Sequence, residues 1–385
     1  MFSSVLSHLL AAILPLLLFF LYMHFSRRRR FARRRRAFWQ RQKAEGVKYL
    51  QFAPQNGVAA PLNFLGELES ARTALQTVSL AIDLNLFEFL EEKRTATVEA
   101  IGKYLNFSPR HVYATLELLL AADVLCREGE GYRLSERARM YLLKESPFLE
   151  PLPPATQARR YLRIMRNGIV KGAVDKWSRG QAKAPVKWAM RQHTYSMPLG
   201  FALSHGGLLK ERRDVLDVAG GSGAVCIGLA LQNPDMKLQL LDLPGMTKIT
   251  KRMVARYGLE GRIQCLGMDM FNGEWPAQKD AVLFTNIFHD WEDERCVELA
   301  KKAWQALKPG GLILVQEALL NEEKPGPLWT AHWSMVMSLM MKGRQFRGSE
   351  LKTLVQQAGF TDIRIQPLLG YYSTLVGVKP LQTAP

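Results

Sequence analysis

The 385-residue chain is poor in cysteine and lacks the short motifs of several common sites. No Cys-x-x-Cys pair occurs, and the four cysteines lie far apart at Cys126, Cys226, Cys265 and Cys296. This spacing argues against a zinc site and a disulfide framework, and it suits a reducing compartment. The Gly-x-Gly-x-x-Gly motif of nicotinamide enzymes is absent, and no Lys-Ser/Thr pair follows a glycine turn to make a P-loop. We therefore expect no metal site and neither of those nucleotide sites.

Acidic residues are also few: 35 Asp and Glu stand against 52 Lys and Arg, so the formal net charge is +17. Much of the excess is local: the segment RRRRFARRRR at residues 27–36 holds eight arginines, and +17 minus 8 leaves +9. A charge of that size is unremarkable for the remaining chain. The composition therefore does not by itself indicate a nucleic-acid-binding protein.

One long apolar run stands at the N-terminus, VLSHLLAAILPLLLFFLYMHF at residues 5–25. With its weakly polar flanks it is long enough for the ~30 Å hydrocarbon layer. The arginine block follows the run instead of preceding it, and no Ala-x-Ala cleavage site is present, which disfavours a signal peptide. We therefore predict a transmembrane anchor at residues 1–26.

The arginine block also predicts the orientation of the anchor. Positive residues directly after a span place the following chain in the cytoplasm, which in a bacterium means a single-pass protein of the inner membrane. Residues 27–61 then form a basic tether, in which Arg27 to Arg36 attract anionic lipids. An arginine-rich arm that binds nucleic acid is the alternative interpretation.

Residues 62–145 show the pattern of a winged-helix domain. Apolar residues recur at helical spacing over 65–92, and two shorter helical patterns follow at 97–105 and 108–125, the last opened by Ser108 as N-cap. A hairpin around the sequence EGEG comes next.

A winged helix by itself favours DNA binding. The second helix of this pair, however, is crowded with leucine and offers only Arg110 and His111 near its start for base edges. A dimerisation or lid element is an equally good interpretation. The basic segment 146–210 that follows is predicted to be helical, with breaks at its prolines, including Pro198, and to connect the domains or line an apolar pocket.

The pattern changes to alternating strands and helices over residues 211–385. Buried strands are predicted at residues 214–219, 237–242, 263–268, 280–286 and 312–319, and a hairpin at 362–368 and 373–379. Helical patterns separate the first five strands, so we expect a doubly wound, mostly parallel α/β sheet. The short last connection requires antiparallel pairing.

Ligands of such sheets bind at the carboxyl ends of the strands. The first strand ends in DVAGGSG, in which Asp217 is followed by Gly220, Gly221 and Gly223. These glycines let the backbone approach a ligand closely. A glycine turn alone is a weak signal, and its meaning depends on the loops beside it.

The next three strand ends carry matching chemistry. Asp242 closes the second strand about 20 residues after the glycines, where a carboxylate suits a ribose diol. Asp269 and Met270 follow the third strand and suit an adenine ring. The sequence NIFHDW, with His289, follows the fourth. The four loops together predict a site for an adenosine ligand without phosphates.

The motifs LDVAGGSG, LLDLPGM, GMDMF, NIFHDWED, LKPGG and LLGYYSTL occur in this order between residues 65 and 379. In this the chain resembles the plant-type O-methyltransferases and their bacterial relatives, which use S-adenosylmethionine. The resemblance implies a class I methyltransferase fold of Rossmann-like type and an N-terminal domain that forms a homodimer. It thereby replaces the DNA-binding interpretation of that domain.

The resemblance also implies roles for individual residues. Gly220 and Gly221 would cradle the amino-acid part of the cofactor, Asp242 would hold the ribose, and Asp269 and Met270 would contact adenine. The same cofactor site is predicted to include the neighbouring residues Asp217, Gly223, Leu243 and Phe271.

For catalysis, the resemblance implies that His289 is the general base and that Glu317 orients it. Imidazole titrates near pH 6.5 and can take the proton of a hydroxyl as its oxygen attacks the methyl group. A carboxylate on the far ring nitrogen stabilises the imidazolium that forms. Asp290 and Trp291 are expected to shape the loop.

The sequence KGRQFRG departs from the family pattern Gly-[Lys/Arg]-Glu-Arg-Thr. Gln345 stands in place of a second glutamate beside the histidine, and Phe346 and Arg347 follow it. Glutamine keeps the shape but loses the charge. Three interpretations stay open: an O-methyltransferase for an acidic hydroxyl, a methyltransferase acting at carbon or on an unusual hydroxyl, and a catalytically weak relative.

The composition of the methionine-rich sequence WSMVMSLMM predicts a buried core segment. The resemblance implies instead that this segment faces the substrate, with Trp333, Met337 and Met341 as candidate contacts. An anchored enzyme suggests a lipophilic aromatic or polyene acceptor. The alternative from another class is a membrane-tethered regulator that senses S-adenosylmethionine, but the leucine-rich helix at 108–125 offers little to DNA.

Overall fold

The computed structural model describes residues 62–149, 158–167 and 186–381, which belong to one compact unit spanning residues 57–385. The predicted transmembrane anchor at residues 1–26 and the tether at 27–61 lie outside the described residues. Within those described ranges, no helix is both long enough and apolar enough to cross a membrane.

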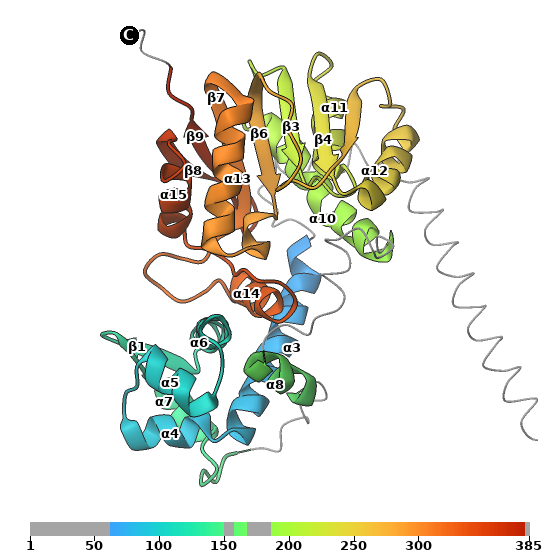
Figure 1. The fold of residues 1–385 in the computed structure, drawn as a ribbon. Coiled ribbons are helices and arrows are strands. Elements are labelled where there is room, and N and C mark those ends of the chain that lie inside the picture. Colours follow the sequence, from blue (N-terminus) through green and yellow to red (C-terminus); the bar gives the residue numbers. More distant parts are fainter. Residues whose placement is uncertain (1–61, 150–157, 168–185, 382–385) are drawn as a thin grey trace, which may run out of the picture. The chain divides into compact units, whose positions relative to one another are not determined.

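The N-terminal part of the described chain is mainly helical (Figure 1). Its elements are α3 (Leu62–Asp83), α4 (Leu86–Lys93), α5 (Val98–Leu105), α6 (Pro109–Ala121), β1 (Leu125–Glu128), β2 (Gly131–Leu134) and α7 (Glu136–Tyr141). The predicted order of a helix pair followed by a hairpin is present. Leu125 pairs with Leu134 in the antiparallel hairpin, and the chain turns through Gly129 at a positive φ of 59°.

The helical pattern at residues 65–92 is interrupted, contrary to its periodicity. Asn85 adopts a left-handed conformation with φ of 56° and separates α3 from α4. Asparagine tolerates this region better than most residues, so one residue can redirect the chain while both helices keep their apolar faces inward. Phe87 and Leu90 of α4 are fully buried as a result.

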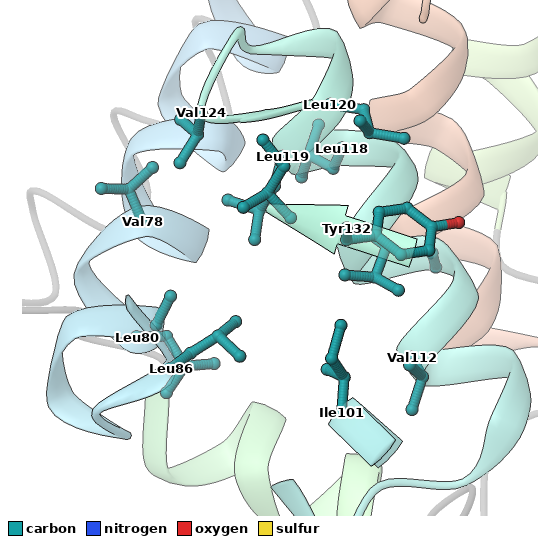
Figure 2. Packing of buried hydrophobic residues seen from close by; sticks show 14 of the residues in the cluster. Val78, Leu80, Leu86, Ile101, Val112, Leu118, Leu119, Leu120, Val124 and Tyr132 are labelled. Atoms are coloured by element: carbon teal, nitrogen blue, oxygen red, sulfur yellow. The ribbon is translucent and has the colours of Figure 1, made fainter. Parts of the chain in front are cut away.

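Apolar side chains from these helices meet in one cluster (Figure 2). Leu118 and Leu119 of α6 lie in it together with Leu86 of α4 and Ile101 of α5. Each fully buried aliphatic side chain of this size contributes roughly 1.5–3 kcal/mol relative to exposure. The leucines of α6, which in the sequence argued against a DNA-recognition helix, are therefore core residues.

The connector contains α8 (Ala158–Asn167) and α10 (Val186–His205). Pro198 lies inside α10, so the predicted break at this proline is wrong. The helix is held from outside by α11 (Ala224–Gln232): a Cβ atom at Gly200 would lie 2.6 Å from the carbonyl oxygen of Val225. This close crossing of two backbones fixes α10 despite the hydrogen bond that its proline cannot donate.

The C-terminal part forms a seven-stranded sheet in the order β5-β4-β3-β6-β7-β9-β8. Its strands are β3 (Asp214–Val218), β4 (Lys237–Asp242), β5 (Ile263–Gly267), β6 (Lys279–Thr285), β7 (Leu307–Ala318), β8 (Thr361–Leu369) and β9 (Tyr372–Val378). The first five run parallel, and β9 pairs antiparallel with both β7 and β8. This confirms the predicted doubly wound sheet with an antiparallel C-terminal hairpin.

The chain leaves the centre of the sheet from β3 toward β5 and returns to add β6 on the other side of β3. Ligand sites of doubly wound sheets lie at such a switch point. Helices α12 (Pro244–Arg256), α13 (Asp293–Ala306) and α15 (Gly348–Gln356) complete the layers, and α13 and α15 pack against each other beside β6 to β9 (Figure 1).

One helix had no counterpart in the sequence interpretation. The methionine-rich stretch forms α14 (Leu328–Met340), which packs on α6 and α3 of the N-terminal helices and contacts the turn that carries His289. Its Ala331, Met335 and Leu339 join the N-terminal apolar cluster. The helix is apolar around most of its surface, so its sequence has little of the amphipathic periodicity that reveals a helix.

Candidate active site

The glycine turn after β3 packs tightly against the strands at Gly220 and is open at Gly221. A Cβ atom at Gly220 would lie 2.5 Å from Oδ2 of Asp217 and equally close to Leu240, whereas one at Gly221 would meet no atom of the described residues within 4 Å. Gly221 also has a positive φ of 59°. The turn therefore presents bare backbone outward, as a cradle for a ligand requires, and Gly223 is the N-cap of α11 directly behind it.

Asp217 lies beneath this turn and is fully buried. Its Oδ2 accepts a hydrogen bond from Sγ of Cys226 at 3.4 Å, and its Oδ1 has no hydrogen-bond partner among the described residues. Burial raises the pKa of Asp217 to about 7, with Asp242 adding to the rise and the Cys226 bond opposing it. A buried polar atom without a partner directly under the cradle is consistent with a role in holding a ligand.

Asp242 ends β4 and is tied to the same turn. Its Oδ2 accepts from the backbone N–H of Gly221 at 2.9 Å, and its Oδ1 accepts from that of Leu243 at 2.6 Å. Burial raises the pKa of Asp242 to about 6, although both hydrogen bonds lower it. Each carboxylate oxygen keeps a further lone pair, which suits a ribose diol.

Two residues that support the turn had not been predicted. Thr250 of α12 donates its hydroxyl to the carbonyl oxygen of Gly221 at 2.6 Å, and Nδ1 of His193 in α10 lies 2.9 Å from Oγ of Ser222. Burial lowers the pKa of His193 to about 4, helped by the charge of Arg256, so its ring is neutral. Neither contact has a local sequence signal, because both join segments more than 25 residues apart.

The predicted adenine loop follows β5. Asp269 accepts from the backbone N–H of Phe271 at 2.9 Å and from the side chain of Asn272 at 2.8 Å, which closes the turn. The carbonyl of Met270 accepts from the indole of Trp275 at 2.9 Å. The loop is therefore shaped by its own hydrogen bonds.

Phe271 connects the adenine loop to the histidine loop. The guanidinium carbon of Arg295 lies 3.6 Å from the centre of the Phe271 ring, and the ring of Trp291 meets Phe271 edge-on at 4.7 Å. Trp291 lies two residues after His289. The two predicted halves of the site are thus joined by direct packing.

His289 lies in a short 3-10 turn, Phe288–Asp290, at the end of β6. Its Nδ1 lies 2.7 Å from Oε2 of Glu317 on the neighbouring strand β7. The other oxygen, Oε1, accepts from the backbone N–H groups of Ile287 and His289 at 3.1 and 3.3 Å. Glu317 is fully buried, so these bonds fix both the carboxylate and the loop that carries the histidine.

The Glu317 contact also decides the tautomer of His289. A carboxylate can only accept, so Nδ1 carries the hydrogen and the free lone pair of the neutral ring lies on Nε2. The side-chain nitrogen Nε2 of Gln345 lies 3.0 Å from the same Nδ1, at the position that the family resemblance places beside the histidine. In this orientation of the amide two donors face each other. This contact is favourable when the amide oxygen faces Nδ1–H.

Burial alone lowers the pKa of His289, but the charge of Glu317, its hydrogen bond and the charge of Asp290 together raise that pKa to about 9. Asp290 was expected only to shape the loop. Its Oδ1 nevertheless lies 3.5 Å from Nε2, because the 3-10 turn folds the next side chain back toward the ring. Burial raises the pKa of Asp290 to about 6.

The predicted substrate residues lie on or just after α14. Met337 is buried, Trp333 and Met341 are half-buried, and the Trp333 ring meets those of Trp329 and His332 at 6.0 and 5.7 Å. The same helix reaches the site through Ser334, whose hydroxyl accepts from the backbone N–H of Gln345 at 3.3 Å. No group of three metal-binding side chains occurs in the described residues.

Comparison with known families gives two matches. Residues 188–361 match an O-methyltransferase domain, and residues 69–144 match an O-methyltransferase dimerisation domain. The second match covers the helices and hairpin that were predicted from sequence to be a dimerisation element.

Individual relatives agree with these matches. Acetylserotonin O-methyltransferase of Bos taurus is 32% identical over 346 residues, covering 82% of this chain and 97% of the relative. A 3-hydroxy-5-methyl-1-naphthoate 3-O-methyltransferase of Streptomyces sahachiroi is 27% identical and covers 78% of this chain and 90% of its own length.

Among solved structures, an O-methyltransferase family 2 protein of Planctomyces limnophilus in complex with apigenin has the same fold. It has a TM-score of 0.69 at 22% identity and covers 82% of this chain and 95% of the solved chain. Together with the relatives, the matches assign the chain plainly: it belongs to the O-methyltransferase family and is an S-adenosylmethionine-dependent O-methyltransferase.

Proposed function

We propose that this enzyme methylates a hydroxyl of a lipophilic aromatic or polyene acceptor, best a phenol, with His289 as the general base. The observation that carries the proposal is the 2.7 Å contact between Nδ1 of His289 and the buried carboxylate of Glu317. That contact leaves Nε2 as the basic atom at the carboxyl edge of the sheet, where the predicted cofactor loops also end.

Each catalytic residue then has one task. Nε2 of His289 takes the hydroxyl proton while the oxygen attacks, and Glu317 stabilises the imidazolium that results. Gln345, whose side-chain nitrogen lies 3.0 Å from Nδ1, lies against the ring without adding charge. Asp290, 3.5 Å from Nε2, is placed to accept from the protonated ring.

The raised pKa of His289 suits a phenol. A phenol ionises near pH 10, so moving its proton to a base of pKa about 9 costs about 1.4 kcal/mol. The same transfer to an unperturbed imidazole near 6.5 would cost about 5 kcal/mol. In the free enzyme at pH 7 the ring is mostly protonated, so we expect the rate to increase with pH up to this pKa.

The cofactor site fits the residues present. Gly220 and Gly221 leave bare backbone, Asp242 offers carboxylate oxygens, and the loop with Asp269 and Met270 is preformed, so these residues would hold S-adenosylmethionine. When bound, the cofactor supplies an activated methyl group on a positively charged sulfur. The chain contributes position and a proton acceptor, and positioning alone can lower such a barrier by several kcal/mol.

Substrate recognition is assigned to α14. Trp333, Met337 and Met341 supply aromatic and polarisable surface that suits a flat apolar acceptor. The relatives support an aromatic hydroxyl, because the Streptomyces sahachiroi protein is named for a hydroxynaphthoate. The dimerisation-domain match supports a homodimer.

Membrane attachment belongs to the same proposal. The apolar run at 5–25 and the arginines of 27–36 would anchor the enzyme with its catalytic part in the cytoplasm, near a membrane-dissolved acceptor. Fractionation of cells expressing the full chain, compared with a chain lacking residues 1–26, tests this. Recovery of both forms in the soluble fraction would refute the anchor.

The activity test uses the full-length protein with labelled S-adenosylmethionine and a panel of phenols and naphthols of increasing apolar size. We expect label in the acceptor and a preference for larger apolar rings. The same panel is measured with the variant Trp333→Ala, which should raise KM most for the larger acceptors. Transfer that ignores acceptor size, or label that appears only at carbon, would contradict the proposed substrate class.

A further inference from the structure

The segment 343–347, sequence GRQFR, packs tightly against the catalytic loop. A Cβ atom at Gly343 would lie 2.3 Å from the carbonyl oxygen of His289, so only glycine fits this approach. The backbone N–H of Gln345 donates to Ser334 of α14 at 3.3 Å, and the carbonyl of Phe346 accepts from Leu320 at 2.9 Å. Contacts with α14 and with the chain just after β7 thus hold the segment that carries Gln345.

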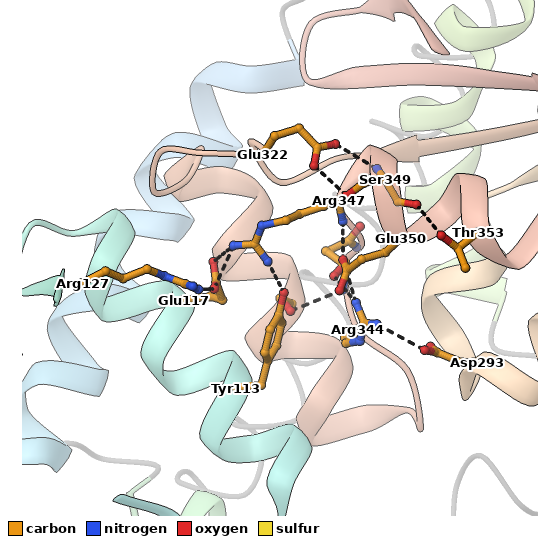
Figure 3. Close-up of polar contacts among 12 residues, drawn as sticks. Tyr113, Glu117, Arg127, Asp293, Glu322, Arg344, Arg347, Ser349, Glu350 and Thr353 are labelled. Atoms are coloured by element: carbon orange, nitrogen blue, oxygen red, sulfur yellow. Dashed lines mark hydrogen bonds and ion pairs between the residues drawn. The ribbon is translucent and has the colours of Figure 1, made fainter. Parts of the chain in front are cut away.

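A third attachment comes from the N-terminal domain (Figure 3). Nη2 of Arg347 lies 3.0 Å from both carboxylate oxygens of Glu117 on α6, and its Nη1 donates to the hydroxyl of Tyr113 at 2.6 Å. The side chain of Glu117 is only 1% exposed, and Nη2 of Arg127 on β1 lies 2.8 Å from its Oε1. A buried carboxylate thus joins the dimerisation domain to a residue two positions from Gln345.

Arg344 fastens the other end of the segment. Its guanidinium lies 3.0 Å from Glu350 and 3.4 Å from Asp293, and its central carbon is 5.4 Å from the ring centre of Tyr113. Tyr113 therefore contacts both arginines: its hydroxyl accepts from Arg347, and its ring lies beside Arg344. The two arginines flank Gln345 on both sides in sequence.

A network of this kind is costly to bury, and removal of one partner leaves an uncompensated buried charge. It attaches to the segment that carries Gln345 beside the histidine ring. Arg347 stands where the family pattern that this chain resembles has threonine, so the sequence pattern does not account for the pair.

We propose that Glu117, Tyr113 and Arg347 are positioning residues, through which the dimerisation domain sets the placement of Gln345 against His289. The proposal rests on the proposed role of His289 as base. Disturbing the network should change methyl transfer and the titration of His289 while leaving the cofactor loops, which lie on other strands, unaffected.

The test compares Arg347→Met and Tyr113→Phe in the full-length enzyme with Arg139→Met. The control breaks an exposed pair in the same domain, in which Nε of Arg139 lies 2.8 Å from Glu91. We expect kcat to fall about tenfold in Arg347→Met and less in Tyr113→Phe, because misplacing a catalytic group by about 1 Å can lower the rate up to 100-fold. The affinity for S-adenosylhomocysteine should be unchanged. The control should retain its activity.

A double-mutant cycle identifies the route. In a Gln345→Ala background, Arg347→Met should have little further effect, and the titration of His289 followed by NMR should move in Arg347→Met but not in the control. If Arg347→Met alone does not fold, the double variant Glu117→Gln/Arg347→Met, which removes both charges of the pair, is used in its place.

Equal losses in the Gln345 and Gln345→Ala backgrounds, or a loss no greater than that of Arg139→Met, would overturn the positioning role. Failure of the base assignment would look different. In that case His289→Ala would keep its activity, whereas the NMR shift caused by Arg347→Met would still appear.

Discussion

Replacing Gln345 by glutamate tests the electrostatics of the site. The substitution places a carboxylate about where the amide now lies, 3.0 Å from Nδ1 of His289. At an effective dielectric constant of about 20, opposite charges ~4 Å apart attract by about 4 kcal/mol. Burying the new charge beside Glu317 offsets much of this attraction, so we expect the pKa of His289 to rise by about 1–2 units above its value of about 9.

The sign of the effect on rate follows from the role of the neutral ring. At pH 7 a base of pKa about 9 is about 1% deprotonated, and each added unit lowers that fraction about tenfold. Gln345→Glu should therefore reduce kcat/KM at pH 7, by less than the ~10- to 100-fold loss of neutral ring, because the more basic ring also accepts the phenol proton more readily. The deficit should shrink as the pH rises, because the variant then recovers its neutral base.

The assay is the pH profile of kcat/KM with a fixed phenol, supported by an NMR titration of His289 in the free enzyme. Gln345→Met is the matched control, since it removes the amide without adding charge and should not move the titration of His289 upward. An unchanged profile in Gln345→Glu, or one displaced toward acid, would refute this account of the His289 environment.

Three further predictions concern the loops and the buried pair. Gly220→Ala should weaken folding by about 1–3 kcal/mol in urea denaturation and weaken cofactor binding, because its Cβ would lie 2.5 Å from Asp217. Gly261→Ala, which meets no atom in the described part of the chain within 4 Å, should change neither. Phe271→Ala removes the ring between Arg295 and Trp291, so calorimetry should show weaker S-adenosylhomocysteine binding together with a lower kcat; normal binding would exclude this link. Because the pKa of His289 is raised from 6.5 to about 9, its stabilising contribution should be complete below pH 6.5 and lost as the pH rises through 9, so the unfolding free energies of wild type and Glu317→Gln should converge over that range; a constant difference would contradict the ion pair.

The sheet and the strand-end residues could be predicted because they depend on local pattern. Buried parallel strands are short apolar runs, and their carboxyl ends meet at one edge, so Asp242, Asp269 and His289 were expected at the same edge of the sheet. The contact of Gln345 with His289 came from the family resemblance, since no local pattern links residues 56 positions apart.

Other features depend on tertiary structure that no local signal reports. The break at Asn85, the uninterrupted helix through Pro198 and the existence of α14 all reflect packing that outweighs local preference. The Arg347–Glu117 pair and the contact of His193 with Ser222 join distant segments. Charged residues in the sequence are usually solvated, so a fully buried Glu117 could not be recognised before the fold was known.

The most direct test of the central claim is replacement of His289 by alanine in the full-length enzyme. We predict that single-turnover methyl transfer at pH 7 falls by about 10²- to 10⁴-fold, the usual contribution of a general base, while the affinity for S-adenosylhomocysteine is retained. Added imidazole should restore part of the rate. Methyl transfer at the wild-type rate in His289→Ala would show that another group takes the proton and would contradict the account.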